Sequence, residues 1–180
     1  MRGTSVTAEH YPRTNFVFAP PVENPAAWQA SPETFRNALT QAFPDAFLEP
    51  LTSSLRDAPA LDFEIEVAPD VFVTGTAVMP APDYAHVSIV DVTADAAALF
   101  AQWLRDSYLP STTSVLFLSS SVMESGHETP WPLPTTGDAK EIEAVLRNHL
   151  ALPNPSARRP RRPRPLPTSP EAHWDPDNVG

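Results

Sequence analysis

The amino-acid sequence predicts an α+β fold in which a mixed sheet of about four to five strands packs with three to four helices. Two observations predict the sheet. Three β-type runs between residues 61 and 92 are joined by short turns containing proline, which indicates a three-strand antiparallel meander. A helical pattern then leads into the apolar run 115–118, which indicates a β-α-β crossover whose last strand is parallel to the third strand of the meander.

The composition divides the chain into three regions. Residues 1–30 form an irregular N-terminal segment, in which the apolar run 15–19 fits an edge strand. Residues 31–152 form a single α+β domain. Residues 153–180 hold eight of the 23 prolines and show no hydrophobic periodicity, so they are expected to form a disordered tail rich in proline and arginine.

Two helices are expected before the meander. Ser31 begins the first one, because a serine cap is followed by a proline and an acid in the first helical turn, and Pro44 ends it. In the segment 45–56, apolar residues recur every four positions. This spacing predicts a second helix, which Pro50 interrupts.

The later helices have clearer start signals. Thr93 is expected to cap the helix that follows the meander, and Pro110 ends that helix. Asp138 and Glu141 resemble a capping box that opens the last helix, whose inward-facing stripe includes His149. The intervening segment 119–135 is expected to be a long loop, and loops of that length are often functional or disordered.

The charge distribution excludes several function classes. Residues 1–157 carry 7 basic and 19 acidic side chains, a net charge of −12, whereas residues 158–180 carry 5 arginines and 3 acids, a net charge of +2. An acidic domain repels phosphate backbones, so the folded domain is not expected to bind nucleic acid. The chain has no cysteine, which excludes disulfides and thiolate chemistry, and it has no apolar run long enough for a transmembrane segment. These features predict a soluble cytoplasmic protein.

Acidic residues occupy one face of the first meander strand. Asp62, Glu64 and Glu66 alternate with apolar residues, so the carboxylates share one side of the strand. Two interpretations stay open: a solvated outer face, or a surface that attracts a basic protein partner.

The long loop supplies a second set of candidate protein-binding residues. Glu124 and His127 lie beyond the apolar run, and Trp131 sits between two prolines. A stiffly held aromatic side chain loses little entropy when it docks, which favours Trp131 as an interface anchor. The alternative is that Trp131 folds back and covers the last helix.

Catalytic and metal sites are not predicted. Asp91, His127 and the serines at 119–121 contain the residue types of an acyl-transfer triad, but the segment lacks the GxSxG elbow that such a nucleophile needs. The five histidines are scattered, without the spacing of a zinc site. We therefore expect no catalytic residue, no metal and no cofactor.

The tail contains a candidate linear motif. Arg164, Pro167 and Pro170 match the Arg-x-x-Pro-x-x-Pro pattern and resemble ligands of Src-homology-three domains. The arginines at 158–164 also favour electrostatic contact with anionic surfaces such as RNA, a membrane or the acidic domain of the same molecule.

Three resemblances follow from the order of elements and the composition. The order helix, three strands, helix, strand, helix over about residues 31–150 resembles that of class I type III secretion chaperones, which have one further strand before the last helix. The small, acidic and cysteine-free composition is similar to that of bacterial immunity proteins. Reading 15–19 as a strand and 45–56 as a helix gives an order similar to acetyl-CoA-dependent N-acetyltransferases, but the segment 91–96 has no glycine where that family binds pyrophosphate.

The leading functional hypothesis is a non-enzymatic cytoplasmic protein-binding module, of the immunity-protein or chaperone kind, that binds a basic partner. The alternative is an acyltransferase-like enzyme, or a degenerate relative of one, with an altered cofactor loop.

Overall fold

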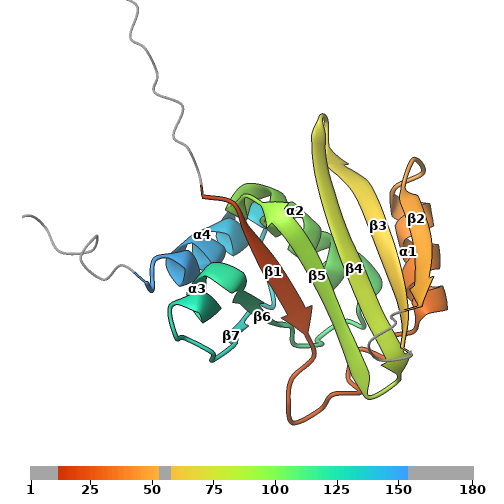
Figure 1. Ribbon diagram of the computed structural model, residues 1–180, viewed down its shortest axis with the longest axis horizontal. Helices are drawn as coiled ribbons and strands as arrows, with labels where there is room; N and C mark the ends of the chain where they lie inside the picture. The colour runs from red at the N-terminus through yellow and green to blue at the C-terminus, as the bar shows by residue number, and fades with distance from the viewer. Residues whose placement is uncertain (1–11, 53–57, 154–180) are drawn as a thin grey trace, which may run out of the picture.

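The computed structural model describes residues 12–52 and 58–153, which form one antiparallel sheet with helices packed against it (Figure 1). The strands in this part of the chain are β1 (Thr14–Ala19), β2 (Phe47–Thr52), β3 (Pro59–Ala68), β4 (Val71–Ala81), β5 (Tyr84–Val92), β6 (Leu116–Ser119) and β7 (Trp131–Pro132). The helices are α1 (Pro32–Ala42), α2 (Ala94–Trp103), α3 (Ser120–Glu124) and α4 (Ala139–Leu150), and a π-helical turn, Leu104–Tyr108, continues α2.

The strand order is β2-β3-β4-β5-β1-β6-β7, and every neighbouring pair is antiparallel. The predicted mixed sheet of four to five strands with a parallel strand is therefore wrong. Strands β5 and β6 do run in the same direction, because both are antiparallel to β1, but β1 lies between them. The run 15–19 was expected at an edge of the sheet, and it instead fills the gap that the crossover leaves.

The predicted helix over 45–56 is also wrong, because residues 47–52 form the edge strand β2. Residues four apart share a face in a strand as well as in a helix, so the apolar spacing did not distinguish the two. Pro50 pairs with Leu61 at the edge of the sheet, where a residue without an N–H group is tolerated.

Two of the three predicted caps are confirmed. Thr93 precedes α2 at the N-cap position, but its side chain makes no capping hydrogen bond. The side chain of Ser31 accepts a hydrogen bond from the backbone N–H of Thr34, and α1 starts at the next residue, Pro32. At α4, Asp138 Oδ1 accepts the N–H groups of Lys140 and Glu141 at 3.0 and 3.1 Å, while Glu141 Oε2 accepts the N–H of Asp138 at 3.1 Å. This is the capping box that the sequence indicated.

The hydrophobic core lies between the sheet and the helices α1, α2 and α4, which are seen behind the strands in Figure 1. Aromatic rings dominate it: Phe63 stacks on Phe100 at a centroid distance of 5.7 Å, and Phe35 meets Phe63 edge-on at 5.7 Å. These contacts hold α1 and α2 on the same side of β3. The alternate residues of each strand, which point away from this core, form the other side of the sheet.

The segment 119–135 is not a continuous loop. It contains α3, the loop that follows it and the short strand β7, which pairs with β6. The predicted tail at 153–180 and its Arg164-Pro167-Pro170 motif lie, apart from Pro153, outside the described residues. Within the described ranges, no helix is both long and apolar enough to cross a membrane.

Candidate protein-binding face

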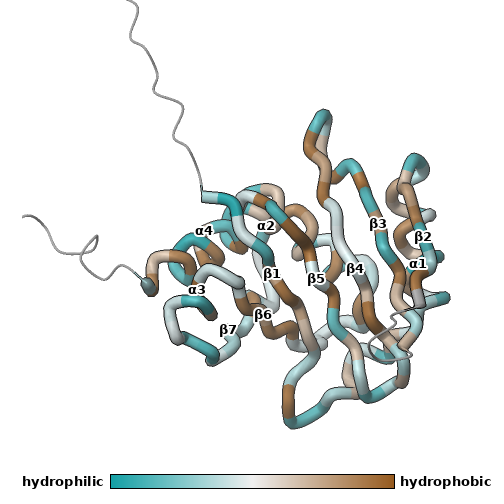
Figure 2. Tube along the Cα trace, viewed as in Figure 1, coloured by the Kyte–Doolittle hydropathy of each residue, from teal (hydrophilic) through white to brown (hydrophobic). Residues whose placement is uncertain are grey.

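One side of the sheet is not covered by α1, α2 or α4, and we call it the open face. It looks toward the viewer in Figure 1, and the outward residues of β3, β4 and β5 lie on it. Hydrophilic positions recur along β3 in Figure 2. The burial pattern agrees, because buried and more exposed residues alternate along β3 and β4.

Carboxylates collect on the open face over β2 and β3. Asp62, Glu64 and Glu66 share this side of β3, as predicted from their alternation, and Glu49 of β2 pairs directly with Asp62. We call these four residues the acidic half of the open face. Like charges directly opposite each other across two strands destabilise a sheet, so the Glu49–Asp62 pair does not help the fold.

Uncharged hydrogen-bond donors satisfy some of these carboxylate oxygens. Thr76 Oγ1 donates to Asp62 Oδ1 at 2.5 Å, Thr74 Oγ1 donates to Glu64 Oε2 at 3.3 Å, and the backbone N–H of Asp70 donates to Glu66 Oε1 at 2.7 Å. The ion pairs found among the described residues lie elsewhere and are Arg13–Asp91, Arg105–Asp106 and Arg147–Glu143. The acidic half therefore presents carboxylate oxygens without a cation from residues 12–52 or 58–153.

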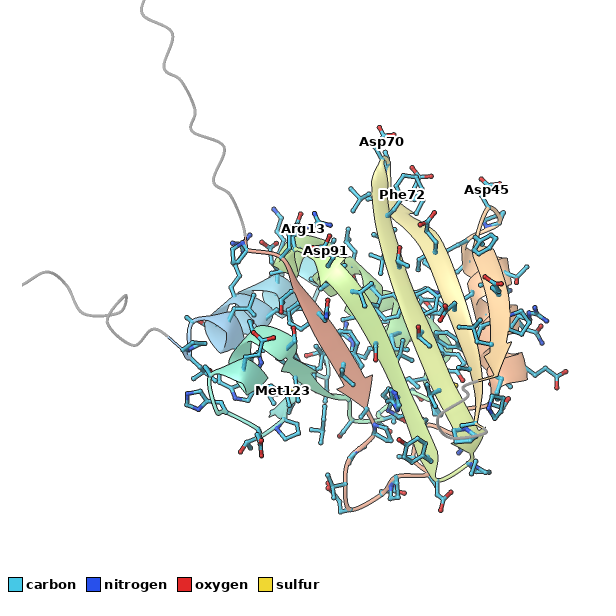
Figure 3. All side chains as sticks on the ribbon, in the orientation of Figure 1. Arg13, Asp45, Asp70, Phe72, Asp91 and Met123 are labelled. Carbon is cyan, nitrogen blue, oxygen red and sulfur yellow. The ribbon has the colours of Figure 1, made fainter. Side chains whose placement is uncertain are left out.

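Two exposed phenyl rings flank the carboxylates. Phe47 is 61% exposed and pairs with Glu64, and Phe72 is 56% exposed and pairs with Glu66. Figure 3 shows Phe72 at the start of β4, close to the turn at Asp70. A carboxylate can accept the N–H groups of a guanidinium while an aromatic ring packs against its flat face. The combination therefore suits arginine.

The opposite part of the open face is apolar. A groove of about 240 Å³ lies over β1 and β6, and we call it the apolar groove. Val22 is 80% exposed and Met123 is 46% exposed at its rim. The residues lining it carry no charge and are Val17, Ala19, Pro20, Val22, Leu116, Phe117, Leu118, Met123 and Pro130. In Figure 3, Met123 lies at the lower left and Phe72 at the upper right, so the groove and the acidic half are separated across the same view.

The structure separates the two predicted sets of binding residues. Strand β3 is next to one edge of the sheet, and β7, which contains Trp131, is the other edge. Glu124 and His127 are exposed near the end of α3. Trp131 is half-buried and meets the ring of His149 edge-on at 5.1 Å, so it packs against α4. Trp131 is therefore not fully available as an interface anchor.

His149 occupies the inward face of α4, as predicted, and is fully buried. The backbone N–H of Ser119 donates to His149 Nε2 at 3.2 Å, which assigns the proton of the neutral ring to Nδ1. Burial, with a smaller repulsion from His127, lowers the pKa of His149 below its usual value. The ring therefore joins α4 to β6 in its neutral form.

Two residues of the types found in an acyl-transfer triad, Asp91 and Ser119, make structural contacts instead. Asp91 forms an ion pair with Arg13 at 3.1 Å and its backbone N–H donates to Asn15 Oδ1 at 2.8 Å, where β1 and β5 shift register. Ser119 Oγ accepts the N–H of Val122 at the start of α3. Among the described residues, no group of three or more histidine or acidic side chains could hold a metal ion.

No family model, curated protein or solved structure matches this chain. The functional argument therefore rests on the open face itself. Alternation revealed its three carboxylates on β3, but Glu49, Phe47 and Phe72 were missed. A signal for Phe72 was present, since it alternates with the apolar residues that face the core. Phe47 and Glu49 were missed because the segment 45–56 was predicted to be a helix.

Proposed function

We propose that this protein is a non-enzymatic protein-binding module, of the kind that immunity proteins and secretion chaperones represent, and that a basic partner binds its open face. The observation that carries the proposal is the combination of the four carboxylates in the acidic half with the exposed rings of Phe47 and Phe72. Arginine-rich surfaces are the natural complement of such a face.

The apolar groove supports a protein partner over a small cation. A protein interface usually has an apolar, desolvated part and a charged rim, and the open face offers both within one sheet. About three to four strand spacings, or roughly 17 Å, separate β3 from the groove over β1 and β6. A single partner segment that carries basic side chains and one apolar anchor spans this distance.

The test is co-purification with the triple variant Asp62→Asn, Glu64→Gln and Glu66→Gln, which we call the face variant. The wild-type protein should retain a stoichiometric basic partner from a lysate of its own source, and the face variant should lose at least about tenfold in affinity for that purified partner. Raising the salt concentration should weaken the wild-type complex and narrow the difference.

A matched control carries the same change in net charge at exposed acids elsewhere: Glu23→Gln, Glu33→Gln and Glu128→Gln. The control variant should bind the partner as the wild type does. An equal loss of partner affinity in both variants would show that only the net charge matters and would contradict the proposed face. The proposal also assumes the cytoplasmic location expected from the sequence, so a partner confined to another compartment would contradict it.

The acyltransferase alternative has no specific observation in its favour. Its expected pyrophosphate position contains Asp91, whose carboxylate is engaged by Arg13. Calorimetry with acetyl-CoA separates the two hypotheses, because micromolar binding favours the enzyme and contradicts a purely protein-binding role.

A further inference from the structure

We propose that the arginines of residues 158–164 occupy the acidic half of the open face in the same molecule and compete there with the external partner. The inference rests on the proposed function, and it specifies how that same site is regulated. The occupant is a named segment of this chain outside the described residues, and the docking surface is the sheet face that α1, α2 and α4 leave open.

Charge complementarity identifies this occupant. The described residues carry 5 basic and 17 acidic side chains, whereas positions 158–164 carry five arginines and two prolines. These five arginines are the densest group of cations in the chain, out of 12 basic residues in all. They match a face whose carboxylates have no cation from the described part of the molecule.

The side-chain chemistry also fits. Each guanidinium has a planar fork that meets a carboxylate with two N–H groups, and its flat face packs on an aromatic ring. Glu64 lies beside Phe47, and Glu66 lies beside Phe72, so each ring has a carboxylate next to it. Arginine uses both groups at once, whereas lysine presents a compact point charge.

The length of chain beyond α4 allows the contact. Strand β3 lies five strand spacings from β7 at the far edge, about 24 Å at roughly 4.8 Å per spacing, and the helix layer lies about 10 Å behind the sheet. Even a segment that leaves the far edge of the molecule thus has to cover only about 26 Å in a straight line. At the roughly 3.1 Å per residue of polyproline II, the chain from Pro153 spans about 28 Å to Arg162 and about 34 Å to Arg164, so these two arginines reach β3 even from the far edge. Arg158 and Arg159, about 16 and 19 Å along the chain, then lie over the neighbouring strands and add to the attraction at longer range.

Tethering makes a weak contact effective. A short linker gives an effective concentration on the order of 1 mM, so a segment that binds the face with a Kd of about 0.1 mM when free would occupy it about nine-tenths of the time when attached. An external partner would then bind roughly tenfold more weakly than it binds a face without the tail.

The first test locates the tail by paramagnetic broadening in the full chain. The sequence has no cysteine, so Thr168→Cys gives a single site for a nitroxide label. The backbone amide signals of Glu64, Glu66 and Thr74 should lose intensity at low salt, and the amide signal of Glu33 on α1 should not. About 1 M NaCl, or the face variant, should restore the lost signals.

Two outcomes of this measurement overturn the inference. Broadening that does not favour β3 and β4 over α1 means that the tail does not occupy the acidic half. The second outcome comes from a mixture of two proteins, one with the isotope but no nitroxide and the other with the nitroxide but no isotope. Equal broadening in this mixture means that the tail of a second copy is the occupant.

The second test measures competition in the full chain. The probe is a fluorescent synthetic peptide of residues 156–166, and the comparison is with a tail-neutral variant that carries Arg158→Gln, Arg159→Gln, Arg161→Gln, Arg162→Gln and Arg164→Gln. The peptide should bind the tail-neutral variant about tenfold more tightly than the wild type. Equal affinity for the two proteins contradicts occupation by the tail.

The two tests separate this inference from the proposed function. If the purified partner still depends on Asp62, Glu64 and Glu66 but the peptide binds wild type and tail-neutral variant equally, only the inference about the tail fails. If the peptide competes as expected but the face variant retains the partner, the tail contact stands and the proposed role of the face fails.

Discussion

Acidification from about pH 7.5 to about pH 5.0 is expected to destabilise the domain through His149. This residue is 0% exposed, Nε2 accepts the backbone N–H of Ser119, and Nδ1 has no hydrogen-bond partner among the described residues. The rings of Phe117 and Trp131 meet it edge-on at 5.0 and 5.1 Å. A proton on Nε2 would abolish the bond from Ser119 and leave a charge in an apolar site.

The sign follows from the lowered pKa. The unfolded chain binds a proton at His149 below its usual value of 6.5, whereas the folded chain resists that proton because the site is buried. The stabilisation is therefore complete above about pH 6.5 and is lost as the pH falls from there toward the folded-state pKa. Each pH unit in this window costs up to about 1.4 kcal/mol, so pH 5.0 costs at most about 2 kcal/mol.

The measurement is urea unfolding of the wild type and of His149→Gln across this pH range. Glutamine does not titrate, so the difference in unfolding free energy between the two proteins should narrow by up to about 2 kcal/mol as the pH falls. His127→Gln, at an exposed position, removes only the smaller cause of the lowered pKa, so it should keep most of the pH dependence of the wild type. A difference between wild type and His149→Gln that stays constant with pH would refute the buried neutral histidine.

Three further variants test contacts that hold the fold. Arg105 is buried and donates to three backbone carbonyls in the loop before α4, so Arg105→Gln should lower the unfolding free energy in urea by about 3 kcal/mol, and Arg105→Lys should recover only part of it. A Cβ on Gly75 would lie 2.3 Å from the Ser88 carbonyl oxygen and 2.5 Å from Phe63 Cζ. Gly75→Ala should therefore lower the unfolding free energy by about 2–3 kcal/mol, measured by thermal unfolding, and an unchanged melting temperature would contradict the close packing. Asp138→Ala should cost about 1 kcal/mol because two helix N–H groups lose their acceptor, while Asp138→Asn should keep most of the stability.

Local signals predicted the elements whose causes are local. Helix α4 follows from Asp138 and Glu141, because a capping box and a 3.6-residue apolar period are both read within one turn or two. Strands β3, β4 and β5 follow from alternation and from the short turns between them. The helix predicted to end at Pro110 does continue to Tyr108, but the sequence does not indicate that residues 104–108 form a π-helical turn.

Non-local pairing was not predictable in the same way. Phe16 and Phe18 point into the core from β1, but an apolar run of this length fits an edge position and a central position equally well. Insertion of β1 between β5 and β6 changes a mixed sheet into an antiparallel one. The acidic half could not be fully predicted for the same reason, because Glu49 lies opposite Asp62 only through the pairing of β2 with β3.

Two features of the open face have no explanation in the stability of the fold: the like-charge pair Glu49–Asp62 and the exposed rings of Phe47 and Phe72. Glu49 lies directly opposite Asp62, where a threonine or lysine at either position would remove the repulsion. Phe47 and Phe72 leave most of their surface in water, although a polar residue would serve an exposed strand position. Both features lower the stability of the isolated domain, and both strengthen contact with a guanidinium. The proposed function accounts for both features, because arginine from a partner would complete this surface, and under the further inference the tail would supply it in the free protein.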